Sequence, residues 1–553
     1  MRLMSAILVV CLPGLFLPAP ARRGAPATWN VLYVKPGGNG NCSSWADACE
    51  LQTALAFASP LDQIWVAEGT HTPTSATGNR STTFLLVGGV SVYGGFAGTE
   101  TSLDQRDWVA HPTVLSGDLQ GDDGPDFANY GDNSYHVVTC NHAVGTAVLD
   151  GFTIRGGNAN LHGGTTNDHG GGINGGGRLT VMHVIVSDNM TLGSGGGMYT
   201  DGIGPTLVDV TFRSNSANSG GGFHYTATGP LGTNVTFSDD SAENAGGIYG
   251  ETSSSAATLE NVTFSGNTAT GSGGGMFQHL GNATLANVTF SGNRATQDGG
   301  GMFNVGDDVT LTDVSFRNNV SEQNGGGMAN MSDPTLDKVA FSGNVAKVGG
   351  GLFNEIGSPS LTNVTFSGNI AGAGGGLANL ESSPTMVNVT FSANDAYLGA
   401  TAIGNWDNSN PVLANAIVWA RSADIVGTSS GELIFNDGTS STTVTYSDVQ
   451  GGHFGAGNIG GDPHFVRQPG PGGDGVMGTD DDDYGDLRLQ RSSPAIDAGH
   501  NAAVPAGITT DMDGLNRFVD VDSVPNSGAG TAPIVDMGAY EAHYQVHLPL
   551  VMR

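Results

Sequence analysis

Acidic side chains near the C-terminus are the residues of this chain best suited to binding a divalent cation. Calcium takes six to eight oxygen ligands, mostly from carboxylates and carbonyls, and flexible loops can gather them. The candidate ligands are Asp474, Asp480, Asp481, Asp482 and Asp483 in one loop, and Asp511, Asp513 and Asn516 in another. Their spacing matches an EF-hand loop only in part, so solvated acidic loops are the alternative to bound Ca²⁺.

Catalytic groups for polysaccharide chemistry are harder to assign. A lyase of the pectate type needs a calcium-binding carboxylate cluster and a base that removes a sugar proton. A glycosidase needs two carboxylates about 5–10 Å apart. The middle of the chain offers the acidic pairs Asp239-Asp240 and Asp307-Asp308, and four histidines near glycines, His162, His169, His224 and His279. The histidines lack metal-ligand spacing and a nucleophile partner, so we predict surface histidines and assign no catalytic residue.

Most of the chain between the two ends is a tandem repeat of about 25 residues. A phenylalanine recurs at Phe212, Phe237, Phe264, Phe290, Phe316, Phe341, Phe366 and Phe391. Three positions later stands Asn215, Asn267, Asn293, Asn319, Asn344, Asn369 or Asn394, with Asp240 replacing asparagine in the second unit. A catalytic site would interrupt this repetition, and the available interruptions are Arg421 and the long loop Gly117–Tyr135.

A glycine triplet recurs in step with the phenylalanines. The triplets are Gly195–Gly197, Gly220–Gly222, Gly273–Gly275, Gly299–Gly301, Gly325–Gly327, Gly349–Gly351 and Gly374–Gly376, and each precedes an apolar residue. Glycine permits the positive φ angles that tight turns between short strands need. Helices are disfavoured here, because glycine and β-branched residues both have low helix propensity.

The physics of one unit predicts a coil of short strands. Val288, Thr289 and Phe290 alternate inward and outward as in a half-buried strand, whereas Leu285 is out of phase, so a corner should separate it from Val288. Such a unit buries its apolar face only when the next coil stacks on it at about 4.8 Å. Stacking should place the phenylalanines in a core stack and the asparagines in a hydrogen-bonded ladder.

A second set of asparagines allows a functional alternative to ladder formation. Asn234, Asn261, Asn287, Asn363 and Asn388 each begin an Asn-Val-Thr sequence, which matches the N-glycosylation acceptor pattern. Because they recur at one repeat position, a structural ladder is the favoured interpretation.

The sequence therefore predicts an all-β fold, a single-stranded right-handed parallel β-helix with a helix-containing N-terminal cap and a β-rich C-terminal cap. We expect a signal peptide in 1–27, the N-terminal cap and first coils in 28–110, and the repetitive β-helix in 111–400. The last coils should occupy 401–460 and an acidic, anchor-like cap 461–553. In the N-terminal cap, Leu51, Ala54, Leu55 and Ala58 share one face of the short amphipathic helix expected at Trp45–Ala58.

The N-terminus and the cysteines indicate export. Arg2, an apolar segment too short to span a bilayer and the small residues around Ala21 are typical of a signal peptide. Cys42 and Cys49 bracket a short loop and could form a disulfide in an oxidising compartment. Cys140 is left over, and we expect it to be a buried apolar residue.

The charge balance excludes several classes of partner. The chain has 19 Lys and Arg against 51 Asp and Glu, a formal net charge of −32. Nucleic acid and anionic membrane surfaces would be repelled, and no basic patch offsets this charge. No stretch after the first residues is long and apolar enough for a transmembrane helix. Divalent cations and neutral glycans suit the acidic surface, and we expect a monomer.

The paired glycine and Phe-x-x-Asn signatures, over roughly Gly170 to Asn394, resemble the repeats of the chlamydial polymorphic outer membrane proteins, which are carried on a pectin-lyase-like β-helix. That resemblance implies an adhesin. The C-terminal motifs Asp462-Pro-His-Phe465, Leu487 to Gly499, Asp511-Met-Asp-Gly514 and Asp536 to Glu541 resemble the choice-of-anchor Q type of domain.

Together these features favour a secreted or cell-surface protein without catalytic activity, an adhesin or glycan-binding scaffold whose partners are extracellular glycans or cell-surface components. The alternative is a polysaccharide lyase or glycoside hydrolase of the pectin-lyase-like fold, because fold does not determine function.

Overall fold

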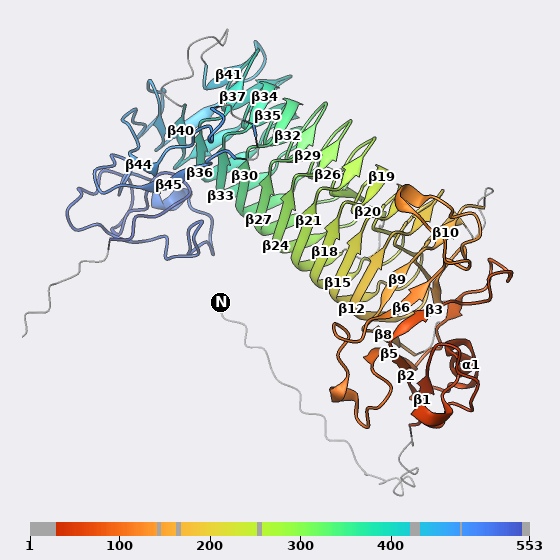
Figure 1. The fold of residues 1–553 in the computed structure, drawn as a ribbon. Helices are drawn as coiled ribbons and strands as arrows, with labels where there is room; N and C mark the ends of the chain where they lie inside the picture. Colours follow the sequence, from red (N-terminus) through yellow and green to blue (C-terminus); the bar gives the residue numbers. More distant parts are fainter. Residues whose placement is uncertain are drawn as a thin grey trace, which may run out of the picture.

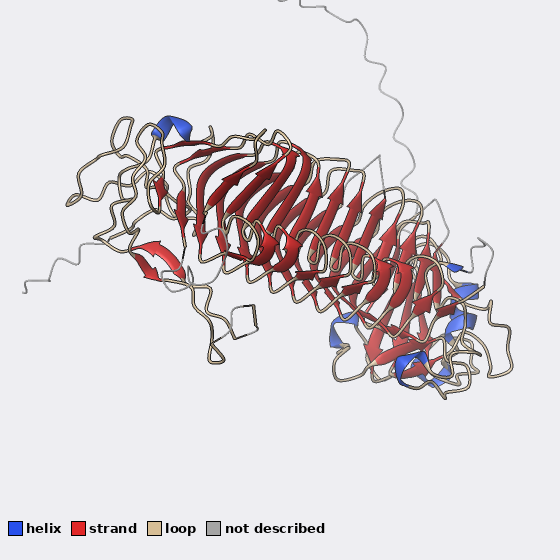
Figure 2. Cartoon of the chain, turned by 90° about the horizontal axis from the view of Figure 1, so that it is seen from above, coloured by secondary structure: helices blue, strands red, loops and turns tan. Residues whose placement is uncertain are grey.

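The computed structural model describes residues 29–140, 145–161, 168–251, 257–420, 432–475, 478–479 and 481–544. The expected signal peptide, His162, Arg421 and Asp480 lie outside these residues. The described part is an elongated stack of coils whose strands run side by side along the stack (Figure 1 and Figure 2). Three parallel sheets form its sides. Parallel strands joined by crossovers are almost always connected in the right-handed sense, and the predicted right-handed parallel β-helix is confirmed.

Sheet 1 is the longest side of the stack and contains twenty strands. These strands are β1 (Val31–Val34), β2 (Gln63–Ala67), β3 (Gly69–His71), β5 (Ser91–Phe96), β6 (Thr113–Ser116), β8 (Ala147–Asp150), β9 (Thr153–Arg155), β12 (Leu179–Ser187), β15 (Thr206–Arg213), β18 (Leu231–Ser238), β21 (Thr258–Ser265), β24 (Thr284–Ser291), β27 (Thr310–Arg317), β30 (Thr335–Ser342), β33 (Ser360–Ser367), β36 (Thr385–Ser392), β39 (Val412–Ala414), β40 (Ile417–Trp419), β42 (Thr443–Thr445) and β43 (Asp448–Val449).

Sheets 2 and 3 form the other two sides. Sheet 2 comprises β10 (Asn158–Ala159), β13 (Met190–Thr191), β16 (Ser216–Ser219), β19 (Ser241–Asn244), β22 (Thr268–Ala269), β25 (Arg294–Ala295), β28 (Val320–Ser321), β31 (Val345–Val348), β34 (Ile370–Ala373) and β37 (Asp395–Ala396). Sheet 3 comprises β4 (Phe84–Leu85), β7 (Val138–Cys140), β11 (Ile173–Gly175), β14 (Met198–Thr200), β17 (Phe223–Tyr225), β20 (Ile248–Glu251), β23 (Met276–His279), β26 (Met302–Val305), β29 (Met328–Met331), β32 (Leu352–Gly357), β35 (Leu377–Ser382), β38 (Ile403–Trp406) and β41 (Ile434–Asn436).

Each long strand of sheet 1 bends in its middle, as the phase of its apolar residues requires. In β24, Leu285, Val288 and Phe290 are all buried, and the backbone of Asn287 between them has φ +53°. Leu285, Val288 and Phe290 pair in register with the corresponding residues of β27. The corner expected between Leu285 and Val288 therefore lies at Asn287.

The recurring phenylalanines stack inside the coil. Neighbouring rings from Phe212 to Phe391 have centroids 4.6–5.0 Å apart and planes within 9° of parallel. All eight belong to the main hydrophobic core. The triplet glycines lie against this stack, and a Cβ on Gly301 would be 2.5 Å from the carbonyl oxygen of Gly327. Close approach of coils thus requires glycine there.

The asparagine column forms a continuous buried ladder, which we call the inner ladder. The backbone N–H and the Nδ2 of Asn267 both donate to Oδ1 of Asn293, at 3.1 and 2.9 Å. Nδ2 of Asn267 also donates to the carbonyl of Phe237, at 3.0 Å. The pattern repeats along Asn189, Asn215, Asp240, Asn267, Asn293, Asn319, Asn344, Asn369 and Asn394.

Two further asparagine ladders run along the stack. Inside sheet 3, each Nδ2 donates to the next Oδ1 along Asn304, Asn330, Asn354, Asn379, Asn405 and Asn436. The Asn-Val-Thr asparagines lie at the outer corners of sheet 1. Asn287 donates to Asn261, and Asn261 donates to Asn234, at 2.6 and 3.1 Å.

The N-terminal end of the stack carries helix α1 (Leu51–Phe57), which buries Leu51, Ala54 and Leu55. It is shorter than the expected Trp45–Ala58, because a separate 3₁₀ turn occupies Trp45–Asp47. Cys42 and Cys49 form a disulfide there. Cys140 is a buried free cysteine.

The C-terminal region lies along the outer face of sheet 1 beside the last coils (Figure 1). Its regular elements are the antiparallel pair β44 (Phe465–Arg467) and β45 (Asp486–Leu489) and a 3₁₀ turn at Asn501–Ala503. Phe465, Ile496 and Met537 share a hydrophobic cluster with Ile417 of β40. The backbone N–H of Ala539 donates to Oγ1 of Thr390 in β36, at 2.9 Å. The C-terminal region therefore covers outward-facing residues of the last strands of sheet 1, whereas the corresponding residues of earlier strands face solvent.

Candidate binding site on the outer face of sheet 1

Two recesses lie on the outer face of sheet 1 near its N-terminal end, where long loops replace the regular repeat. One loop joins β5 to β6 and the other joins β6 to β7. The second loop includes the 3₁₀ turns at Pro125–Phe127 and coincides with Gly117–Tyr135, the interruption visible in the sequence. Loops carried on a rigid sheet are common sites of binding.

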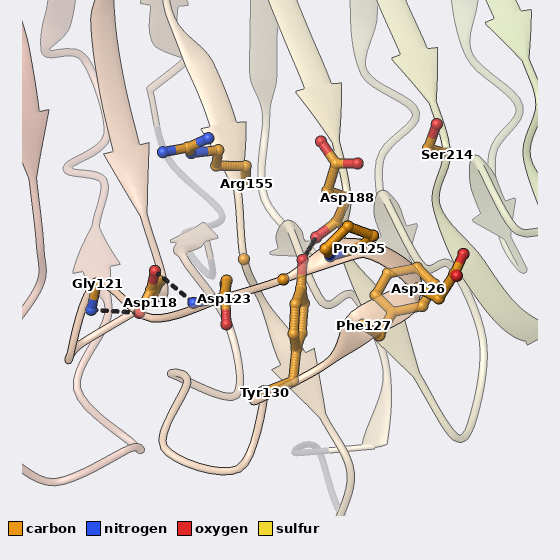
Figure 3. Close-up of a pocket in the computed structure, with 12 residues that line it drawn as sticks. Asp118, Gly121, Asp123, Pro125, Asp126, Phe127, Tyr130, Arg155, Asp188 and Ser214 are labelled. Atoms are coloured by element: carbon orange, nitrogen blue, oxygen red, sulfur yellow. Dashed lines mark hydrogen bonds between the residues drawn. The ribbon is translucent and has the colours of Figure 1, made fainter.

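The acidic recess has a volume of about 540 Å³ and lies under the β6–β7 loop (Figure 3). Its lining includes Asp118, Asp123, Asp126, Phe127, Tyr130, Arg155, Asp188 and Ser214. Arg155 ends β9, while Asp188 and Ser214 directly follow β12 and β15. These three strands are parallel neighbours, in which Arg155 pairs with Ser187, the residue before Asp188, and Ser187 pairs with Arg213, the residue before Ser214. Successive coils therefore bring Arg155, Asp188 and Ser214 to the same end of the three strands.

Two oppositely charged groups in this recess have no internal partner. Among the described residues, no hydrogen bond or ion pair engages the guanidinium of Arg155 or the carboxylate of Asp188. In Figure 3 both side chains point away from the loop that carries Tyr130. They can therefore bind a ligand without first breaking an internal contact.

Aromatic residues form the loop side of the acidic recess. The rings of Phe127 and Tyr130 meet edge to face, with centroids 5.2 Å apart. The hydroxyl of Tyr130 donates to the backbone carbonyl of Asp188, at 2.9 Å, which ties the loop to the coil stack. Burial raises the pKa of Tyr130, so it remains a hydrogen-bond donor at neutral pH.

An acidic cluster lies in the same loop. Carboxylate oxygens of Asp118, Asp122 and Asp132 all lie within 4.8 Å of one another. Oδ1 of Asp118 accepts the backbone N–H of Gly121, at 2.6 Å. Beside them, burial raises the pKa of Asp123 to about 6, although Nδ2 of Asn133 donates to its carboxylate. The donor set consists of hard oxygen atoms, the type that Ca²⁺ prefers.

The second recess, the Trp108 recess, has a volume of about 400 Å³ and a more apolar lining. Trp108, Val109 and Ile185 are 37%, 82% and 36% exposed, so apolar surface is available to a ligand. The ring of Trp108 stacks on His183 with centroids 4.2 Å apart. Thr211 and Asp209 contribute the polar part of the lining.

A charged network fixes the wall of the Trp108 recess. Oδ2 of Asp150 is paired with Nη2 of Arg106 at 2.6 Å, and both side chains are nearly buried. Oδ1 of Asp150 lies 2.8 Å from Nδ1 of His183. Nε2 of His183 lies 3.6 Å from Oδ2 of Asp209. An imidazole held between two carboxylates can hold or transfer a proton.

The two recesses are neighbours on the same three strands. The Trp108 recess is lined by Thr153, Ile185 and Thr211, which lie on β9, β12 and β15. These residues precede Arg155, Asp188 and Ser214 of the acidic recess by two or three positions in the sequence. At about 3.3 Å per residue, the two sets are about 7–10 Å apart along the strands. One extended ligand can therefore contact both recesses.

The carboxylates of the first predicted calcium loop are engaged by other groups. Asp483 accepts two hydrogen bonds from Arg467, at 2.5 and 2.9 Å. Asp482 accepts the backbone N–H groups of Gly478 and Thr479, at 2.6 and 3.1 Å. Asp481 accepts the hydroxyl of Thr479 and the backbone N–H of Asp474, at 2.8 and 3.2 Å. Calcium binding at this loop stays a prediction.

The second predicted group is likewise bonded to protein. Asp511 is buried, and its carboxylate accepts backbone N–H groups of Asp513, Leu515 and Glu541, at 3.0, 2.9 and 2.9 Å. Nδ2 of Asn516 donates to the carbonyl of Phe518, at 3.1 Å. Among the described residues, the one group of three or more potential metal-ligating side chains is Asp118, Asp122 and Asp132 instead.

The roles of some residues were predicted wrongly from the sequence, and other residues of the recesses were missed. His224 is 4% exposed and stacks on Tyr249 with centroids 4.7 Å apart, so it is not a surface histidine. Burial lowers its pKa to about 4. Asp240 lies in the inner ladder and not in a site. Arg155 and His183 carried no motif, because strand register alone brings them into the recesses.

The comparisons with known proteins assign no family to this chain. No family model matches the sequence, and no curated protein matches it. The expected repeat family and anchor type therefore remain resemblances of motif. Among solved structures, the crystal structure of pectate lyase Pel9A is similar with 14% identity and a TM-score of 0.30, covering 94% of this chain and 97% of that chain. A likeness this distant carries no argument about fold or function. No helix in the described ranges has the length and hydropathy to cross a membrane.

Proposed function

We propose that this chain is a secreted or cell-surface β-helix protein, an adhesin or glycan-binding scaffold, that binds an extracellular glycan across the two recesses of sheet 1. The observation that carries the proposal is the unpartnered pair Arg155 and Asp188 beside exposed apolar side chains, at the place where the repeat is interrupted.

The chemistry of the recesses fits a carbohydrate. Binding sites for small ligands combine apolar walls with a few placed polar groups. A sugar presents C–H faces, which suit Trp108 and Ile185, and hydroxyls, which suit Arg155 and Asp188. The spacing of the recesses along the strands accommodates more than one sugar unit. A net charge of −32 disfavours polyanions unless a cation intervenes.

An enzyme of the lyase or hydrolase class is the second candidate. One observation favours it, because the recesses contain acidic groups, an unpaired arginine and a histidine held between two carboxylates. The repetitive body offers no comparable set among the described residues. Turnover of a bound glycan is therefore measured in the same experiment as binding.

A glycan array, followed by calorimetry on the best ligand, tests the proposal. Arg155→Ala should weaken affinity about 10- to 100-fold, because a hydrogen bond to a charged group contributes about 1.5–3 kcal/mol. Arg317→Ala is the matched control, since Arg317 is an exposed residue at the end of β27 on the same sheet. Equal affinities of the two variants would contradict the proposed site. Release of reducing ends or of unsaturated products from the bound glycan would show turnover. The proposed function would then be that of an enzyme and not of a scaffold.

A further inference from the structure

We propose that the β6–β7 loop binds one Ca²⁺ ion through Asp118, Asp122 and Asp132, and that glycan binding in the acidic recess depends on this ion. The dependence on glycan rests on the function proposed above, whereas the ion site stands on its own. This site differs from the two acidic loops that the sequence suggested.

The carboxylate spacing meets the geometric requirement for one ion. Calcium binds its oxygen ligands at 2.3–2.6 Å, so two ligands of one ion lie no more than about 5 Å apart. Oxygens of Asp118, Asp122 and Asp132 lie within 4.8 Å of one another. None of the ion pairs in the described ranges includes these three residues. Backbone N–H groups donate to the carboxylates of Asp118 and Asp132. Three negative charges this close still repel one another, whereas each of them attracts a cation placed between them.

A second, independent observation comes from buried oxygens beside the cluster. Asn133 follows Asp132 directly and is 0% exposed. Its Nδ2 donates to Asp123 and to the carbonyl of Gly156, at 2.9 and 2.7 Å, but its Oδ1 has no hydrogen-bond partner. Oδ1 of Asp123 is also buried without a partner.

Such oxygens are costly to bury. A buried acceptor without a partner costs about 1–3 kcal/mol. The asparagine carbonyl and the carboxylate are both oxygen ligands of the type that complete calcium shells. Two buried oxygens that lack donors, beside three converging carboxylates, point to a cation and not to a ligand that supplies acceptors.

The ion would control the shape of the recess. Phe127 and Tyr130 lie between Asp122 and Asp132 in the sequence, so both ends of the segment that carries them would be held by one ion. Because that segment forms the loop side of the acidic recess, removal of the ion should disturb the contact surface offered to a glycan.

Calorimetry on the full chain after chelation, with Ca²⁺ alone as the probe, tests the ion site. We expect one Ca²⁺ per chain and a rise in melting temperature. Asp122→Asn should lower the affinity for Ca²⁺ at least tenfold and remove the thermal shift, while leaving the fold intact because Asp122 is exposed. The matched control is Asp313→Asn, which removes an exposed carboxylate outside all of the acidic loops and should bind Ca²⁺ like the wild type.

Two results would overturn the site, namely unchanged Ca²⁺ binding in Asp122→Asn or an equal loss of binding in Asp313→Asn. Glycan binding is then measured with Ca²⁺ and with a chelator. A loss of at least tenfold in affinity on chelation supports the dependence, and an unchanged affinity overturns it. If no glycan binds under either condition, the proposed function fails while the calorimetric result for the ion remains valid.

Discussion

At the scale of single residues, Asp240 is the exception within the inner ladder. Its Oδ1 accepts the backbone N–H and Nδ2 of Asn215, at 2.8 and 2.9 Å, whereas its buried Oδ2 has no partner. Asparagines at the same position donate to a phenylalanine carbonyl of the preceding coil. Burial raises the pKa of Asp240 well above its usual range. Asp240 therefore gives up its proton less readily in the folded protein than in the unfolded chain.

Asp240→Asn should stabilise the protein at pH 8, because an amide restores the missing donor without needing a proton. An unfolded aspartate titrates near 3.9, so the raised folded pKa gives a contribution that is complete below that value and lost as pH rises. We expect a gain of about 1–3 kcal/mol in unfolding free energy at pH 8 and a smaller gain at pH 5. Denaturant titrations at both pH values measure this. Exposed Asp313→Asn should change little, and a gain of equal size there would contradict the explanation.

At the scale of elements, the repeated strands derive their stability from columns of identical side chains. The sequence predicted the columns of Phe290 and Asn369, because both recur in register with the glycine triplets. The column of Asn304 in sheet 3 could have been found from the recurring asparagine two positions after the post-glycine apolar residue. The bend at Asn287 followed from the phase of Leu285 and Val288.

The phenylalanine stack predicts a large cost for losing one ring. Phe290 lies between Phe264 and Phe316 with centroids 4.6 and 4.7 Å away. Phe290→Ala should lower the unfolding free energy by about 3–5 kcal/mol, because both burial and packing are lost. Thermal and denaturant unfolding measure this. Phe454 is 99% exposed, and Phe454→Ala should be close to neutral. If both variants melt alike, the assigned register is wrong.

The inner ladder predicts a cost beyond that of an ordinary asparagine. In Asn369→Ala, the donors of Asn344 lose their acceptor and the carbonyl of Phe341 loses its donor. Buried polar groups without partners cost about 1–3 kcal/mol each, so the two sets of groups give an expected loss of about 2–6 kcal/mol. Asn282→Ala, at an exposed position, serves as the comparison in the same denaturant titration. Equal losses would remove the energetic role of the ladder.

At the scale of the whole molecule, the C-terminal region is held against sheet 1 through a junction that contains a buried acid. Asp448 of β43 is 0% exposed, and burial, with a smaller effect from Asp462, raises its pKa to about 7. The sequence predicted an acidic C-terminal region, but its position beside β36 and β40 could not be predicted. That packing depends on single contacts, such as the hydrogen bond between Ala539 and Thr390, and no repeating pattern in the sequence predicts such contacts.

Stability at the junction should fall as pH rises through about 7. Asp448 contributes most below its unfolded pKa of about 3.9, and that contribution is lost when the folded protein gives up the proton. Hydrogen exchange of 461–475 at pH 6 and pH 8 should therefore show less protection at pH 8. Asp448→Asn should remove the difference.

The position of the candidate recesses, by contrast, could be predicted from the loop that interrupts the repeat in the sequence. The roles of Arg155 and His183 could not, because they depend on the strand register.

The inner ladder also gives the coil two complementary ends. From Asn267 to Asn344, each ladder asparagine donates its backbone N–H to Oδ1 of the next asparagine toward the C-terminus. Each also donates Nδ2 to a phenylalanine carbonyl of the preceding coil, so both sides of a coil present the same set of groups to their neighbours. A duplicated coil inserted between two others meets the same partners that the original coils met. Gene duplication of one repeat could thus lengthen this protein in whole coils without redesigning an interface, which accounts for a body of near-identical units between two unlike ends.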